Sequence, residues 1–166
     1  MRMRKAWLWL VGALSFLYWA APLFALDDEL LSLQGLKGLY VVVEELNPEI
    51  EKDGLTPEHI QKDAAQRLRQ AGMKVLTKIE WMKKKEGPYL YINLNARKNP
   101  YGVYMHAISI ELVQKVLLMR NPKVEVFATT WSKQLLGQGG YLARIRYSIQ
   151  DVVDLFLNAW AKANRK

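Results

Sequence analysis

The stretch from Tyr89 to Ser132, YLYINLNARKNPYGVYMHAISIELVQKVLLMRNPKVEVFATTWS, decides the fold. It contains three runs rich in β-branched and aromatic residues, separated by Asn-Pro breaks at 99–102 and 120–123. Proline suits the second position of a four-residue turn because its φ is fixed near the value that the turn requires. Strand-like runs joined by short turns pair with their neighbours, so the stretch predicts an antiparallel meander of three strands.

A strand, a helix and a second strand are predicted upstream of the meander. Residues 39–45, LYVVVEE, form a β-branched run typical of a buried strand. A helix opens at 56–58, Thr-Pro-Glu, a capping residue followed by two residues that favour the first turn. Gly72 ends this helix, and the next strand occupies 73–77. A strand–helix–strand unit of this length predicts that its two strands are parallel.

The strongest helix is predicted at 142–163, where apolar residues recur at spacings of three and four. Glycines at 137, 139 and 140 are expected to form the hinge before it. The element order predicts an α/β domain of the α+β two-layer class, with a mixed sheet of about five strands and two main helices on one face. The predicted core residues are Val41, Val43, Leu68, Ile92, Ile108, Ile110, Leu112, Val126, Ile149 and Phe156.

The N-terminus has the pattern of a secretory signal peptide. Residues 1–5 are basic, 6–21 are apolar and uncharged, and a small residue, Ala25, precedes a polar turn. We therefore expect a signal peptide at 1–25, then one domain at 26–166 with a helical lead-in at 26–38, in a periplasmic or secreted protein. The alternative is an uncleaved membrane anchor over 6–26, a run of about bilayer-spanning length.

Little in the sequence points to catalysis. The chain has no cysteine and two histidines, which excludes disulfides, thiolate metal sites and a cysteine nucleophile. Acids cluster over residues 44–53, but their spacing departs from that of an EF-hand calcium loop. Strand alternation places His106 on the face opposite Ser109 and Glu111, which argues against a Ser-His pair. We predict no catalytic, cofactor-binding or metal-binding residue and no cofactor; a hydrolase-like enzyme is the alternative.

Several segments resemble a family of uncharacterised bacterial exported, periplasmic proteins. They are YVVVEELNPEIEKDGLTPEHIQKDAAQRLRQAGMKVLT, PYLYINLN, ISIELVQKV, RNP, TTWS and SIQDVVDLFLNAW, spread over roughly residues 36–164. The element order is also similar to the N-terminal domain of TolB and to CsgG-type periplasmic domains. These resemblances imply an α/β module that works in the cell envelope, and they bring no functional residues with them. The chain departs from the CsgG type because it lacks a lipid-bearing cysteine.

With both main helices on one face, the other face of the sheet is expected to be open. Aromatic residues mixed with small polar ones are enriched at protein interfaces. The chain is therefore predicted to be an exported, non-catalytic binding or assembly module, whose partner is an envelope protein or a second copy. No nucleic acid partner is expected, and a weak contact with anionic membrane is a further expectation. Alternatively, the aromatics pair across strands and bind nothing, or the N-terminal helix covers them. The predicted partner surface consists of Tyr40, Tyr91, Asn93, Ser109, Glu111, Phe127 and Trp131.

Overall fold

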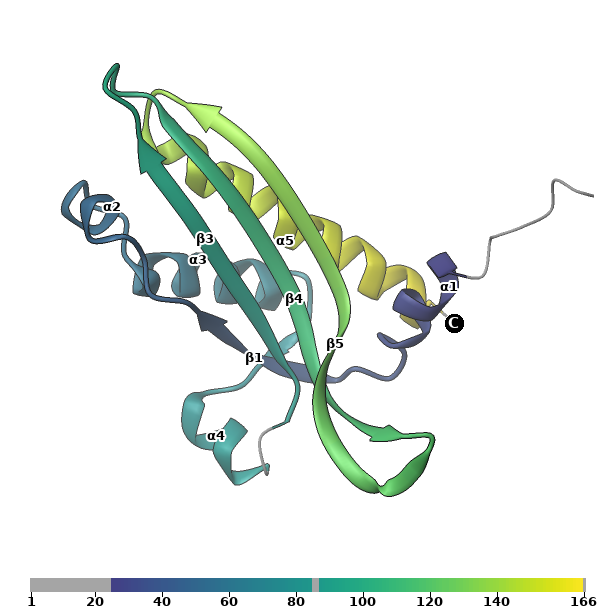
Figure 1. Ribbon diagram of the computed structural model, residues 1–166. Helices are drawn as coiled ribbons and strands as arrows, with labels where there is room; N and C mark the ends of the chain where they lie inside the picture. Colours follow the sequence, from purple (N-terminus) through teal and green to yellow (C-terminus); the bar gives the residue numbers. More distant parts are fainter. Residues whose placement is uncertain (1–24, 85–86, 166) are drawn as a thin grey trace, which may run out of the picture.

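The computed structural model describes residues 25–84 and 87–165, and Figure 1 shows its helices and strands in chain order. The predicted signal peptide lies outside the described residues. The helices are α1 (Ala25–Leu31), α2 (Pro48–Lys52), α3 (Pro57–Gln70), α4 (Lys78–Lys83) and α5 (Leu142–Asn164). The strands are β1 (Gly38–Val43), β2 (Lys74–Val75), β3 (Tyr89–Lys98), β4 (Tyr104–Leu118) and β5 (Asn121–Gly139).

The five strands form one mixed sheet in the order β2-β1-β3-β4-β5. Strand β1 is parallel to β2 and to β3, whereas β3, β4 and β5 form the predicted antiparallel meander. The parallel pairing of β1 with β2 follows from the crossover through α3. The predicted α+β class with a five-stranded mixed sheet is therefore confirmed.

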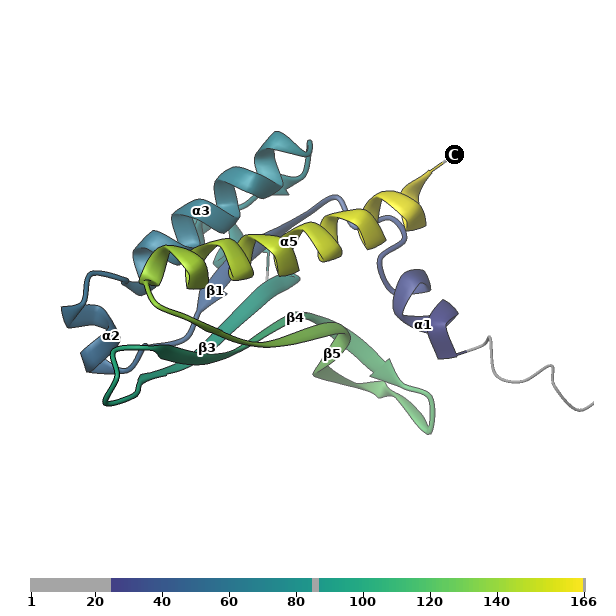
Figure 2. The ribbon, with the colours of Figure 1, turned by 90° about the horizontal axis from the view of Figure 1, so that it is seen from above.

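Helices α3 and α5 pack side by side on one face of the sheet, as Figure 2 shows from above. Helix α3 begins as predicted, because Thr56 accepts a hydrogen bond from the His59 N–H and Pro57 occupies the first turn. Two ion pairs join the helices on their outer surface, Arg67 to Asp154 at 2.5 Å and a second between Arg146 and Asp63. Among the described residues, no helix is both long and apolar enough to cross a bilayer.

The core lies between this helical layer and the inner face of the sheet. At its centre Trp131 meets Phe156 edge to face, with ring centroids 5.1 Å apart. Of the ten predicted core residues, eight are buried and Val43 packs partly buried against them. The prediction for Val126 is wrong. This residue is only half-buried because it pairs with Val116 in the part of the β4–β5 hairpin that extends beyond the helices (Figure 1).

Two segments differ from the sequence prediction. Strand β5 continues to Gly139, so Gly137 and Gly139 belong to the strand and do not form a hinge. Neighbouring side chains leave no space for a Cβ at either position. A Cβ on Gly137 would lie 2.6 Å from the His106 ring, and one on Gly139 would lie 2.8 Å from Arg144. The acidic connection after β1 also contains an unpredicted helix, α2, where the Asn47 side chain accepts from the Glu49 N–H at 2.9 Å.

Candidate functional site

The sheet face opposite α3 and α5 carries most of the predicted partner surface. In the register of the meander, Tyr91 lies across from Glu111, and Asn93 lies across from Ser109. Their neighbours along the strands, such as Ile92 and Ile110, are buried beneath the helices, so alternation turns these four side chains to the opposite face. We call this face, from β1 to β5, the open face. Six predicted residues lie on it: Tyr40, Tyr91, Asn93, Ser109, Glu111 and Phe127.

The seventh predicted residue, Trp131, was placed on the wrong face. It is 2% exposed and packs against Phe156 in the core. The register of β4 and β5 explains the error: Val113 pairs with Thr129, but the preceding Leu112 pairs with Trp131. The extra residue, Thr130, makes a β-bulge, and a bulge reverses the alternation that was counted from Val126. Trp131 therefore belongs to the core and is removed from the candidate site.

A polar cluster occupies the centre of the open face. The Asn93 side-chain amide donates to Glu44. The Tyr91 hydroxyl also bonds to Glu44, and this hydrogen bond is the main reason why the pKa of Tyr91 rises to about 12. Partial burial and the charge of Glu111 act in the same direction. The Tyr91 hydroxyl is therefore a protonated donor at every physiological pH.

A second carboxylate, Glu111, lies beside this cluster and is held by two hydroxyl groups. Thr129 Oγ1 donates to it at 2.9 Å, and Ser109 Oγ donates at 3.4 Å. Among the described residues, neither Glu111 nor Glu44 takes part in an ion pair. In the described part of the chain, the two carboxylates at the centre of the open face thus accept hydrogen bonds from neutral hydroxyl and amide donors and have no cationic partner.

Aromatic side chains form a row at the end of the open face where β3 begins. Trp81 from α4 stacks on Tyr40 with centroids 5.4 Å apart and meets Tyr89 edge-on at 5.8 Å. Tyr89 then approaches Phe127 at 6.3 Å, and Lys115 Nζ lies 5.3 Å from the Phe127 ring. Such contacts stabilise aromatic pairs by about 0.5–1.5 kcal/mol beyond burial. Aromatic residues that pair with one another were the alternative to a partner surface. This pairing is present in the row, which lies at the edge of the polar cluster.

Sequence reasoning missed two members of the aromatic row. Tyr89 has the same strand parity as Tyr91, so alternation alone would have placed it on the open face. Trp81 gave no such signal, because its position depends on how α4 folds back against β1. The Thr77–Glu80 capping box starts this helix, and the Trp81 indole N–H donates to the Gly87 carbonyl at 2.6 Å.

His106 and Ser109 do not form a Ser-His pair. His106 is buried on the helix side of the sheet, as alternation predicted, and both of its ring nitrogens lack a hydrogen-bond partner among the described residues. Burial, followed by the nearby charge of Arg144, lowers the pKa of His106. The sheet therefore stands between this imidazole and the Ser109–Glu111 pair.

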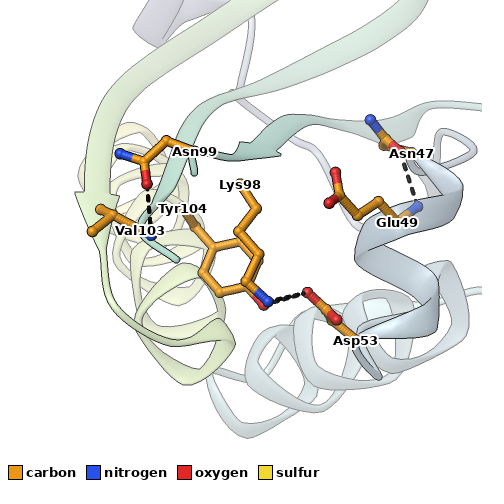
Figure 3. Close-up of polar contacts among 7 residues, drawn as sticks. All are labelled: Asn47, Glu49, Asp53, Lys98, Asn99, Val103 and Tyr104. Atoms are coloured by element: carbon orange, nitrogen blue, oxygen red, sulfur yellow. Dashed lines mark hydrogen bonds and ion pairs between the residues drawn. The ribbon is translucent and has the colours of Figure 1, made fainter. Parts of the chain in front are cut away.

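The acidic connection that was weighed as a calcium loop has another role. Figure 3 shows Asp53 turned toward Lys98 and Tyr104: Lys98 Nζ lies 3.1 Å from the carboxylate, and the Tyr104 hydroxyl donates to it. These two hydrogen bonds hold the pKa of Asp53 below its usual value. Glu44 belongs to the open face, away from this contact. Within the described residues, no group of three potential metal-binding side chains is found.

No family model and no curated protein matches the chain. Two solved structures of PelC from Paraburkholderia phytofirmans, both dodecamers, have a related arrangement. The first, a variant with one substitution, has a TM-score of 0.45 at 17% identity and covers 71% of this chain and 87% of its own. The second has a TM-score of 0.38 at 14% identity, covering 78% and 91%. With these scores the likenesses carry no argument about function, and the resemblance to the exported family stays a prediction.

Proposed function

We propose that this chain is an exported, non-catalytic binding or assembly module of the cell envelope and that its partner is a protein docked on the open face. One observation carries the proposal. The helices α3 and α5 cover one face of the sheet (Figure 2). The opposite face carries Tyr91, Asn93 and Glu111, and no layer of the described residues lies over its centre.

The composition of the open face suits a protein partner. Tyr91 offers a large, rigid ring, and its neighbour Glu44, which raises the pKa of Tyr91, also accepts a hydrogen bond from the Asn93 amide. Rigid aromatic side chains lose little conformational entropy on binding, which is why tyrosine and tryptophan dominate the energetics of many interfaces. Glu44 and Glu111 keep free acceptor positions for backbone or side-chain donors of the partner.

Two features support a binding role over hydrolysis. A serine nucleophile needs a base within hydrogen-bond reach, and the partner that Ser109 has is Glu111, at 3.4 Å. Thr129 Oγ1 donates to the other oxygen of this carboxylate at 2.9 Å, and His106, the imidazole that could serve as a base, lies on the opposite face of the sheet. The export of the chain rests on the apolar segment at 6–21, and the partner is another envelope protein or a second copy of this chain.

Site-specific photocrosslinking in the native envelope tests the proposal. A photoreactive phenylalanine analogue replaces Tyr91 in one variant and Tyr147, an exposed residue of α5 on the helical side, in the control. We expect a discrete crosslinked protein at position 91 and none at 147. The mass of the adduct separates a second copy from a different protein. Equal crosslinking at both positions, or none at 91, contradicts the proposal.

A further inference from the structure

The β4–β5 hairpin continues past the end of the helical layer. Figure 1 shows it projecting away from the helices, and every residue from 119 to 125 is exposed. We call residues 116–125 the hairpin tip. It is distinct from the polar cluster on the open face and needs its own explanation.

Apolar side chains lie on both sides of the hairpin tip. The register pairs Val116 with Val126 on the helix side, while Leu117 points to the other side. Leu117 is 58% exposed and Met119 is 95% exposed, although no layer of the described structure packs on either of them. Leu117 and Met119 thus expose large apolar side chains at the end of a projecting hairpin, a placement that suits a contact surface.

Basic residues surround these apolar side chains. Arg120 and Lys123 flank the turn, and Lys115 stands at the base of the tip over the Phe127 ring. Glu125 is the single acidic residue between 115 and 127. Apolar side chains at an exposed end, ringed by lysine and arginine, complement the apolar interior and anionic headgroups of a lipid surface.

The chain enters the described structure at the same end of the molecule. The residue that follows α1 is held at the base of the hairpin, because Ser32 Oγ donates to the Thr130 carbonyl and Gln114 Nε2 donates to the Ser32 carbonyl, each at 3.0 Å. Figures 1 and 2 both show α1 and the hairpin tip at one end of the sheet.

We propose that the hairpin tip inserts into the surface of an anionic lipid bilayer, with Leu117 and Met119 among the acyl chains and Arg120 on the headgroups. The partner is a membrane surface, and the contact is independent of the protein partner proposed for the open face. Removing one contact leaves the other intact, so each proposal fails separately.

The absence of cysteine makes a direct test possible in the full chain. Met119→Cys and, as a control, Tyr147→Cys each give one labelling position for a polarity-sensitive dye; both side chains are exposed, so folding is unaffected. Vesicles of phosphatidylcholine alone are compared with vesicles that also contain phosphatidylglycerol. We expect a blue shift and quenching by lipid-borne quenchers at 119 with phosphatidylglycerol vesicles, and neither effect at 147.

A second variant tests the charge contribution. In the Met119→Cys background, Arg120→Gln with Lys123→Gln should lower the affinity of the dye-labelled tip for phosphatidylglycerol vesicles roughly 30-fold at low salt, since each basic residue contributes about 1 kcal/mol. For the Met119→Cys protein with both basic residues intact, a dye spectrum that does not change when phosphatidylglycerol vesicles are added overturns the proposal. An equal shift with vesicles of phosphatidylcholine alone overturns it as well. A shift that grows with protein concentration in the absence of lipid overturns it in favour of contact between two copies.

Discussion

Gly137→Ala should destabilise the protein through one identifiable collision. Gly137 faces His106 in the β4–β5 register, and an added Cβ would lie 2.6 Å from the imidazole Nε2 and 2.8 Å from Cε1. Real Cβ atoms do not approach this closely, and His106 is buried in the sheet with little room to move. Overpacking of this kind costs about 1–3 kcal/mol. Gly140, where a Cβ meets nothing within 4 Å, provides the matched control.

Chemical denaturation of the wild type, Gly137→Ala, Gly140→Ala, His106→Ala and the double variant His106→Ala/Gly137→Ala measures the effect. We expect Gly140→Ala to stay within about 0.5 kcal/mol of the wild type, as for substitutions away from packed features. The double variant should be more stable than the sum of its parts, with a coupling of about 0.5–3 kcal/mol, because removing the ring makes room for the new methyl group. Equal effects at 137 and 140, or strict additivity in the double variant, would refute the packing of His106 on Gly137.

Three further predictions follow from burial, ionisation and processing. In a denaturant melt, Trp131→Ala should lower the free energy of unfolding by about 3–5 kcal/mol and Ile110→Ala by about 2–5 kcal/mol, because both side chains are buried. Tyr91→Ala, on the open face, should lower it far less. A small loss for Trp131→Ala would mean that the bulge at Thr130 is misplaced. The folded state lowers the pKa of His106 from 6.5, so the unfolded chain binds the proton first, and the free energy of unfolding should fall as pH drops below about 6.5. His106→Phe should flatten this slope below about pH 6.5, and an unchanged slope would assign it to another group. Mass spectrometry of the protein from the periplasm should find Leu26 at the N-terminus, while an intact Met1 on membrane-bound protein would favour the anchor.

Local sequence patterns predicted the architecture because the strands and the two main helices each show a recognisable pattern, such as a capping residue or a regular spacing of apolar residues. Thr56 and Pro57 mark the start of α3, and the spacing of apolar residues marks α5. The open face followed from alternation along β3 and β4, where the register is unbroken from Tyr89 to Lys98. The prediction failed at Trp131, because a one-residue bulge reverses which face of the sheet the following side chains point to. No residue type near Thr130 indicates the bulge in the sequence.

Features that depend on tertiary packing were also beyond the sequence. The length of β5 is one of them: Gly137 looks like a hinge residue in the sequence but is a strand residue that gives the His106 ring space. The hydrogen bonds of Glu44 with Tyr91 and Asn93 are another, since β1 meets β3 only after the chain has crossed through α3. The face of the sheet on which a side chain lies was therefore largely predictable from the sequence. The residue with which it forms a hydrogen bond on a neighbouring strand was not.

Thiol protection on the open face tests the proposed binding role most directly. Ser109→Cys is nearly isosteric and introduces a single thiol at the centre of the open face, and Tyr147→Cys places one on the helical side. Each variant is treated with a maleimide, both as purified protein and in isolated native envelopes. A docked partner would protect position 109 in the envelope, while position 147 would react equally in both preparations. Equal reaction of position 109 in the two preparations would show that nothing covers the open face and would contradict the proposed function.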